Sequence, residues 1–177
     1  MSYKNENMKM IELHENGLDI QFRIRENGVV ELADFSSQEV KKAVMEPKED
    51  ICYPAVEIHR SGTGSLNMHA YKNNINQSSV DFVYENHELK AQAGGKELEI
   101  VMISPEKLKA VYHMRLFDGV PAVQTWTEII NEGSEDQGLT YVSSFMYQGI
   151  SRGGEKPYYK KTDIYVPFNS WCCEAQW

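Results

Sequence analysis

Histidines and carboxylates are the side chains of this protein that are best able to bind metals or transfer protons. The five histidines are His14, His59, His69, His87 and His113. They are spread one per predicted segment, and no H-x-H, H-x-x-x-H or Cys-His pair gives the convergent spacing that metal sites need. We therefore expect no metal ion and no cofactor, and we interpret His113 as the cross-strand partner of a polar neighbour.

Glycoside hydrolysis is a second chemistry to consider, and it requires two carboxylates about 5–9 Å apart in a cleft. The acids that fall on predicted strands are Glu57, Glu128, Asp163 and Glu174. The sequence pairs no two of them, so each is interpreted as a solvated strand residue or as the partner of a lysine or arginine. No catalytic residue is predicted in this chain.

Two other motifs resemble reactive sites but lack the neighbours that such sites need. Cys172 and Cys173 precede Glu174, and an acidic neighbour disfavours the thiolate that a nucleophilic cysteine requires. Gly62–Gly64 (GTG) follows a predicted strand, but a dinucleotide site also needs a third glycine and a following helix. We interpret the cysteines as unreactive and the glycine motif as a turn.

The tryptophans have aromatic faces that could stack on the apolar face of a sugar ring. Trp126 lies in an alternating segment, where a tryptophan usually fills the core, and we assign it to the core. Trp171 stands close to polar Asn169, so it is the candidate for a sugar contact. Trp171 and Trp177 separate two hypotheses: exposed, coplanar rings would form a sugar platform, whereas covered rings would mark a domain interface.

Hairpin signals place many of these residues on antiparallel strands, because an Asn-Gly dipeptide between alternating segments favours a tight turn. One such dipeptide separates Met10–Glu15 from Leu18–Ile24, and a second separates Leu18–Ile24 from Val29–Ala33. The chain is expected to open with a three-stranded meander at the edge of a sheet. Ser36–Val44 is expected to form one or two weak helical turns, ended by Pro47.

A longer hairpin is predicted in the second half of the chain. Leu108–Leu116 and Val120–Glu132 both alternate with a period of two, and an Asp-Gly turn joins them. We expect this pair to be the central hairpin and Leu139–Met146 to run back as the next strand. Further strands are expected over Ile51–Arg60, Val80–Tyr84, His87–Gln92, Leu98–Ile103 and Asp163–Phe168, and Ser61–Gln77 is expected to be a loop.

This arrangement of elements indicates the fold class. About ten short strands, closely spaced turns and no convincing amphipathic helix predict an all-β fold, namely an antiparallel β-sandwich. The length of 177 residues suits one domain, which we expect to span residues 1–177.

Composition excludes several classes of function. The formal net charge of −8 and the pI near 5.2 argue against nucleic-acid binding, which requires clustered basic residues. No apolar run approaches the roughly 20 residues of a membrane span, and the first residues lack the apolar region of a signal peptide. Three cysteines, two of them adjacent, make a poor disulfide framework. We expect a cytoplasmic protein that contacts neither nucleic acid nor membrane.

Four stretches of the chain form a combined pattern. They are Tyr53–Ile58 (YPAVEI), Val111–Asn131 with its closing N-x-G turn, Ser143–Ser151, and Asn169–Glu174 with its W-x-x-E spacing. In this order they resemble the entry strand, the long strand, a later strand and the following segment in the N-terminal domain of family 36 glycoside hydrolases, the α-galactosidase family. The resemblance covers Ile51–Trp177, and the family's aromatic YYGK-like stretch is missing ahead of it.

The resemblance implies a β-supersandwich similar to galactose mutarotase. It also implies that α-galactosides are hydrolysed, with retention, by a following (β/α)8 barrel that contributes an aspartate nucleophile and an aspartate acid/base. None of that barrel lies in these residues, so we expect a non-catalytic domain and a natural protein that continues beyond Trp177. Trp171, Asn169 and Glu174 are the residues expected to contact carbohydrate.

The partners that the resemblance implies are the α-galactoside substrate of the full-length enzyme, the missing catalytic barrel, and a second copy in a homo-oligomer. Ser61–Gln77 is the loop expected to reach toward a neighbouring active site. An exposed apolar patch of several hundred Å2 is expected where the barrel would pack, since such patches promote association.

Two other classes of function stay open. A free-standing carbohydrate-binding β-sandwich would present an exposed aromatic row and bind a galactoside or an oligosaccharide. An assembly module would lack sugar affinity and show defined self-association.

Overall fold

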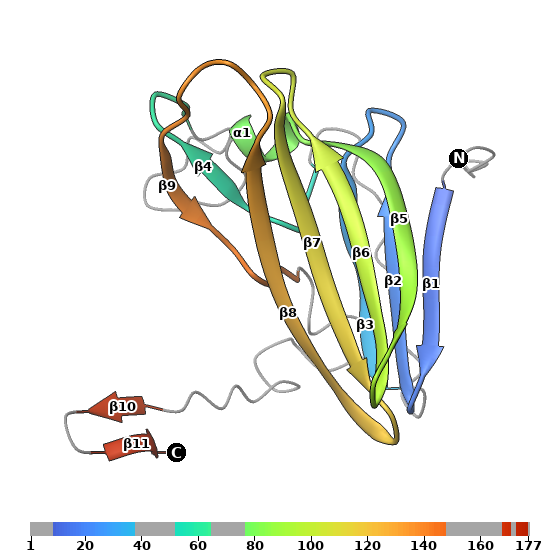
Figure 1. Cartoon of the computed structure of the whole chain (residues 1–177). Coiled ribbons are helices and arrows are strands. Elements are labelled where there is room, and N and C mark those ends of the chain that lie inside the picture. The colour runs from blue at the N-terminus through green and yellow to red at the C-terminus, as the bar shows by residue number, and fades with distance from the viewer. Residues whose placement is uncertain (1–8, 38–51, 65–76, 148–167, 171–172, 177) are drawn as a thin grey trace, which may run out of the picture.

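The computed structural model describes residues 9–37, 52–64, 77–147, 168–170 and 173–176, the last two ranges by their backbone. These residues form a short helix and a series of antiparallel strands (Figure 1). In chain order the elements are β1 (Lys9–Glu15), β2 (Leu18–Ile24), β3 (Val30–Ser37), β4 (Ile58–Arg60), α1 (Gln77–Val80), β5 (Val83–Gln92), β6 (Gly95–Ile103), β7 (Leu108–Phe117), β8 (Val120–Asn131), β9 (Leu139–Val142), β10 (Phe168–Ser170) and β11 (Cys173–Gln176).

Two antiparallel sheets lie face to face and enclose the core. One has the strand order β1-β2-β3, and the other, β5-β6-β7-β8, lies in front of it in Figure 1. β4 pairs with β9, and β10 pairs with β11, in separate two-stranded sheets. The prediction of an all-β, antiparallel β-sandwich is confirmed.

The first hairpin forms because its turn residues tolerate a left-handed backbone. Asn16 and Gly17 have φ angles of 52° and 83°, and a turn with two positive φ angles matches the twist of the strands that it joins. The predicted three-stranded meander is confirmed, although it is a sheet of its own. Ser36 belongs to β3, so the helical turn expected over Ser36–Val44 is wrong at its start. Residues 38–44 lie outside the described residues.

Apolar side chains from facing strands fill the space between the two sheets. The rings of Phe22 in β2 and Tyr112 in β7 meet edge to face, with their centroids 5.7 Å apart. Leu98 and Ile100 of β6 are fully buried in the same core. Because burial of one large apolar side chain contributes about 1.5–3 kcal/mol, this layer is the main source of stability for the sandwich.

Alternation along β7 and β8 decides which side chains face the core. β8 places Thr127 opposite the buried Tyr112, and it places Trp126 opposite His113 on the other face. Trp126 therefore lies half-buried on the outer face of the four-stranded sheet, so its assignment to the core is wrong. Its ring stacks on the His113 imidazole, with centroids 4.6 Å apart.

Two of the predicted strands are one continuous strand. The strand expected over Val80–Tyr84 is wrong at its start, because Val80 ends α1, and its last residues join the strand expected over His87–Gln92 in β5, whose register shifts between Tyr84 and Asn86. A β-bulge of this kind inserts a residue without ending the strand. The β7–β8 hairpin forms as predicted, but β8 is an edge strand, so this hairpin is not at the centre of the sheet.

The strand expected over Leu139–Met146 is shorter and pairs with β4. β9 ends at Val142, and β4 occupies three residues of the strand expected over Ile51–Arg60. Pro54 precedes β4 and forms an isolated bridge with Glu31, and it has no N–H to donate to a ladder. The last predicted strand, Asp163–Phe168, lies outside the described residues except for its final residue, which begins β10.

Candidate functional site

A groove of about 580 Å3 opens beside the β4–β9 sheet. Concave sites that combine apolar walls with a few polar groups are the usual places for ligands. The side chains that line this groove are Glu57, His59, Thr140, Tyr141, Ser143, Phe145 and Met146.

The period-two alternation around β4 directs neighbouring side chains to opposite sides. Val56 and Ile58 are buried in the core, whereas Glu57 and His59 line the groove. Pairing with β9 sets Tyr141 directly opposite His59. A strand that is apolar on one side therefore supplies the polar part of the groove on the other.

Glu57 and His59 form this polar part. Nε2 of His59 lies 3.1 Å from Oε1 of Glu57, and both residues are largely buried. The backbone of Glu57 is fixed by Ser143, because the Glu57 N–H donates to Ser143 Oγ at 2.8 Å and the Ser143 N–H donates to the Glu57 carbonyl at 2.9 Å. The carboxylate and the imidazole are therefore held in place as hydrogen-bonding groups.

Aromatic side chains form the wall of the groove. Tyr141 is 52% exposed and Phe145 is 40% exposed. The Tyr141 ring packs against the His59 ring with centroids 5.0 Å apart, and Phe145 packs edge to face on Phe35 at 5.5 Å. Rings that are supported by neighbouring rings lose little conformational entropy when a ligand binds.

Fixed hydrogen-bonding groups beside an aromatic wall suit a pyranose ring. The hydroxyl groups of a sugar pair with carboxylate and imidazole, while its apolar face packs on an aromatic side chain. Glu57 is the one carboxylate among the lining residues that the structure describes, so this lining lacks the two-carboxylate arrangement of glycoside hydrolysis.

A second group of side chains converges on the outer face of the four-stranded sheet. Glu97, Glu99 and His113 each offer one ligand-type atom, and these atoms lie within 4.8 Å of one another. The two glutamates alternate to the same face of β6, and the register with β7 sets His113 opposite Glu99. His113 contacts a polar neighbour on the adjacent strand, Glu97, as predicted. Paired spacing in the sequence does not reveal this group, because the register of two strands assembles it.

The residues expected to contact carbohydrate lie elsewhere in the chain. Asn169 belongs to β10 and Glu174 to β11, where the structure describes the backbone. Trp171 and Trp177 lie outside the described residues, as does most of the loop Ser61–Gln77. The carbohydrate contacts and the loop function expected at these positions stay predictions.

The sequence held one signal for the groove, which is the spacing of Glu57 and His59. Two polar residues separated by Ile58 in a strand must share a face. Nothing local indicated that Tyr141 and Phe145 would complete the groove, because they come from a strand paired with β4 across a long stretch of chain.

No family model matches the chain, and no curated protein matches it. Within the part of the chain that the structure describes, no helix has the length and apolar character needed to cross a bilayer.

Proposed function

We propose that this chain is a non-catalytic β-sandwich domain of an α-galactosidase-like, retaining glycoside hydrolase of family 36. The observation that supports the proposal is that three of the four stretches that resemble the family meet at Ser143. Tyr53–Ile58 contributes the two backbone contacts of Glu57 with this serine, and Val111–Asn131 contributes the Thr127 hydroxyl, which donates to the Ser143 carbonyl at 2.8 Å. Residues that are 86 positions apart in the sequence are thus in contact, as is expected of segments that belong to one domain.

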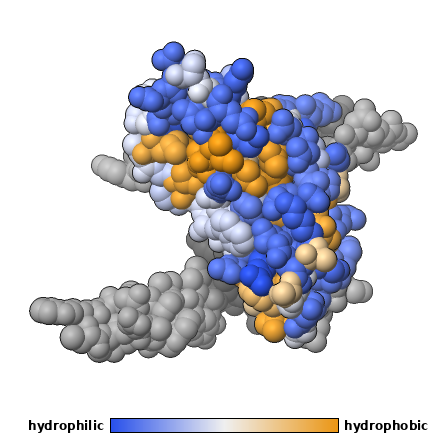
Figure 2. Space-filling model, in the orientation of Figure 1, coloured by the Kyte–Doolittle hydropathy of each residue, from blue (hydrophilic) through white to orange (hydrophobic). Residues whose placement is uncertain are grey.

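In this function the chain supports a (β/α)8 catalytic barrel and the assembly of the enzyme. The outer face of the four-stranded sheet has an apolar area suited to such packing, over the end of the sheet where β6 ends and β7 begins (Figure 2). Val83 and Ile103 are cross-strand neighbours on this face, and Ile130 lies in the same row beyond Lys109; Val83 and Ile130 are more than a third exposed. Exposed apolar surface of this kind favours contact with a barrel or a second copy of the chain.

Carbohydrate binding is a second candidate function, and the groove is the observation that favours it. Glu57 and His59 offer polar partners for sugar hydroxyls, and Tyr141 offers an exposed aromatic face. Carbohydrate binding is consistent with an accessory domain of an enzyme and equally with a free-standing binding module.

Calorimetric titration with methyl α-galactoside tests the groove. We expect the wild-type protein to bind, and Tyr141→Ala to weaken binding about threefold to tenfold, because an aromatic contact contributes about 0.5–1.5 kcal/mol. Phe117→Ala, which removes a ring that does not line the groove, should leave the affinity unchanged. The protein should not hydrolyse a nitrophenyl α-galactoside. Absence of binding to any simple sugar would refute the carbohydrate function.

The coding sequence downstream of the Trp177 codon tests the domain assignment independently. We expect the reading frame to continue for several hundred codons into a strand–helix repeat that contains the two catalytic aspartates. A stop codon directly after Trp177 would contradict the accessory-domain function, and the calorimetric result would then decide between a sugar-binding module and an assembly module.

A further inference from the structure

We propose that the outer face of the four-stranded sheet binds a divalent transition-metal ion through Glu97, Glu99 and His113. This site is on the opposite face of the sheet from the core and is separate from the groove, so it does not depend on the proposed carbohydrate function. The inference rests on the distances between the three side chains, on the atoms that orient them, and on the packing of the histidine.

The distances suit chelation of one ion. Nδ1 of His113 lies 2.9 Å from Oε1 of Glu97 and 4.0 Å from Oε1 of Glu99. Ligand atoms at about 2.1 Å from a metal ion are roughly 3 Å apart when adjacent in an octahedral shell and roughly 4 Å apart when opposite. The two separations from His113 fit such a shell, and all three ligand atoms lie within 4.8 Å of one another, so rotation of the glutamate side chains would complete the shell without a change of strand register.

Each carboxylate is oriented by a partner outside the cluster. Gln92 donates from Nε2 to Oε2 of Glu97, and Lys90 donates from Nζ to Oε2 of Glu99. The oxygen atoms nearest to His113 are the Oε1 atoms, which these two donors do not occupy. Partners that hold the outer oxygen of a ligating carboxylate are the usual support of protein metal sites.

The histidine is also held in the manner of a metal ligand. The side chain of His113 is 10% exposed, and the Trp126 ring stacks on it with an interplanar angle of 6°. Its Nε2 atom is buried and has no hydrogen-bond partner among the described residues, and Oε2 of Glu128 lies 3.7 Å away. A metal-bound imidazole commonly donates its second N–H to a carboxylate, and Glu128 is in position to approach as that acceptor.

Charge and donor type select the kind of ion. Glu88 and Glu128 lie on the same face as the two ligating glutamates, so carboxylates outnumber the nearby cations Lys90 and Arg115. One imidazole nitrogen with two carboxylate oxygens suits a first-row divalent ion such as Zn2+ or Mn2+ rather than a soft ion that requires thiolates. The remaining coordination positions would be open to water.

Calorimetric titration of the full chain with zinc chloride tests the proposal. We expect one ion per chain, and an affinity that falls about tenfold or more in His113→Ala and in Glu99→Gln. Glu99→Gln keeps the shape of the side chain, so it remains informative if His113→Ala does not fold. His14→Ala, which removes an exposed histidine paired with a carboxylate on the other sheet, is the matched control and should bind zinc as the wild type does.

Paramagnetic broadening by Mn2+ locates the ion. In NMR spectra, signals of the His113 ring and the Trp126 indole should broaden first, and Glu99→Gln should remove this selectivity. The proposal is overturned if the wild type binds neither ion, if Glu99→Gln binds zinc as tightly as the wild type, or if His14→Ala is the variant that loses the ion.

Discussion

At the scale of single residues, two adjacent glycines are required for different physical reasons. A Cβ atom on Gly95 would lie 1.9 Å from the Leu116 carbonyl oxygen, so the space is taken by the neighbouring strand. Gly94 has nothing within 4 Å, but its φ angle of 75° is a backbone region that disfavours other residues by about 1–2 kcal/mol. Gly95 is required because of packing against the neighbouring strand, and Gly94 is required because of the conformation of the local turn.

This difference predicts unequal effects of the same substitution. Gly94→Ala should lower the free energy of unfolding by about 1–2 kcal/mol. Gly95→Ala should lower it further, because β7 must move away from the start of β6 to admit the methyl group. Urea unfolding followed by circular dichroism measures both losses, and equal losses would contradict the steric explanation.

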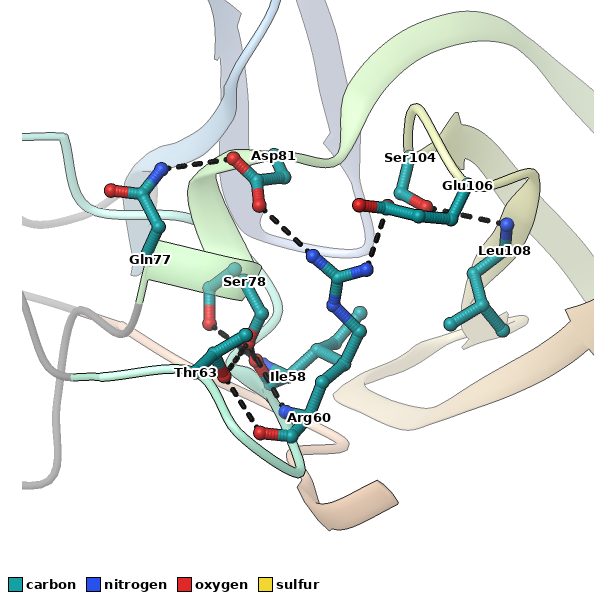
Figure 3. Close-up of polar contacts among 10 residues, drawn as sticks. Ile58, Arg60, Thr63, Gln77, Ser78, Asp81, Ser104, Glu106 and Leu108 are labelled. Carbon is teal, nitrogen blue, oxygen red and sulfur yellow. Dashed lines mark hydrogen bonds and ion pairs between the residues drawn. The ribbon is translucent and has the colours of Figure 1, made fainter. Parts of the chain in front are cut away.

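At the scale of elements, Arg60 fixes β4 to the rest of the fold (Figure 3). Its guanidinium donates to Asp81, which follows α1, at 3.0 Å, and pairs with Glu106 in the β6–β7 turn at 2.6 Å. Its backbone N–H donates to the Ser78 hydroxyl of α1. A strand of three residues has few ladder hydrogen bonds, so these contacts set the position of the strand that lines the groove.

The contact with Arg60 changes the titration of Glu106. Burial by itself would raise the pKa of this carboxyl, but hydrogen bonds from its own backbone N–H, from Arg60 and from Ser104 outweigh burial and lower the pKa. A carboxyl whose pKa is lower in the folded state stabilises the protein above its unfolded-state pKa. That stabilisation is lost as the pH falls through the folded-state pKa.

Arg60→Leu is therefore expected to raise the pKa of Glu106 and to weaken the fold. The free energy of unfolding at neutral pH should fall by about 2 kcal/mol, less than the roughly 3–5 kcal/mol for breaking a fully buried pair. The loss is smaller because Asp81 and Glu106 keep contact with water, being 27% and 42% exposed.

Carboxyl NMR titration and urea unfolding measure the two effects of Arg60→Leu. Lys109→Leu, which removes the more exposed pair with Glu132, is the control and should leave the pKa of Glu106 in place. An unchanged pKa of Glu106 in Arg60→Leu would show that the ion pair does not determine its titration.

At the scale of the whole molecule, polar contacts join the two sheets in addition to the core. The side chain of Asn16 donates to the Phe117 carbonyl and accepts from the Gly119 N–H, both at 2.9 Å, which ties the β1–β2 turn to the β7–β8 turn. Lys96 of β6 forms an ion pair with Glu15 of β1. Each sheet buries its apolar face against the other, so we expect the two to unfold together.

Phe22→Ala tests this cooperativity. Removing a fully buried ring should lower the free energy of unfolding by about 3–5 kcal/mol. Hydrogen exchange should then show amides of β2 and β7 losing protection together. Tyr112→Phe keeps the partner ring and removes only the hydroxyl that bonds with Thr125, so its loss should be about 1 kcal/mol. Retained protection in β5–β8 after Phe22→Ala would show that the sheets are independent units.

The hairpins were predictable from sequence because their causes are local. Asn16 and Gly17 adopt the positive φ angles that an Asn-Gly turn favours, and alternation on either side sets the strands. The bulge in β5 was not predictable, because the residue that slips out of register near Tyr84 is selected by the partner strand β6. The β4–β9 pairing and the groove likewise depend on contacts between distant segments.

The sequence by itself determined that β8 has two faces, with Val123 and Thr127 on one and Trp126 and Glu128 on the other. Alternation is a property of neighbouring residues, so it fixes which side chains share a face. Only the tertiary structure decided which face meets the core, because that depends on the facing sheet. It turned Trp126 outward onto His113, and the register of β6 with β7 brought Glu97 and Glu99 to the same histidine.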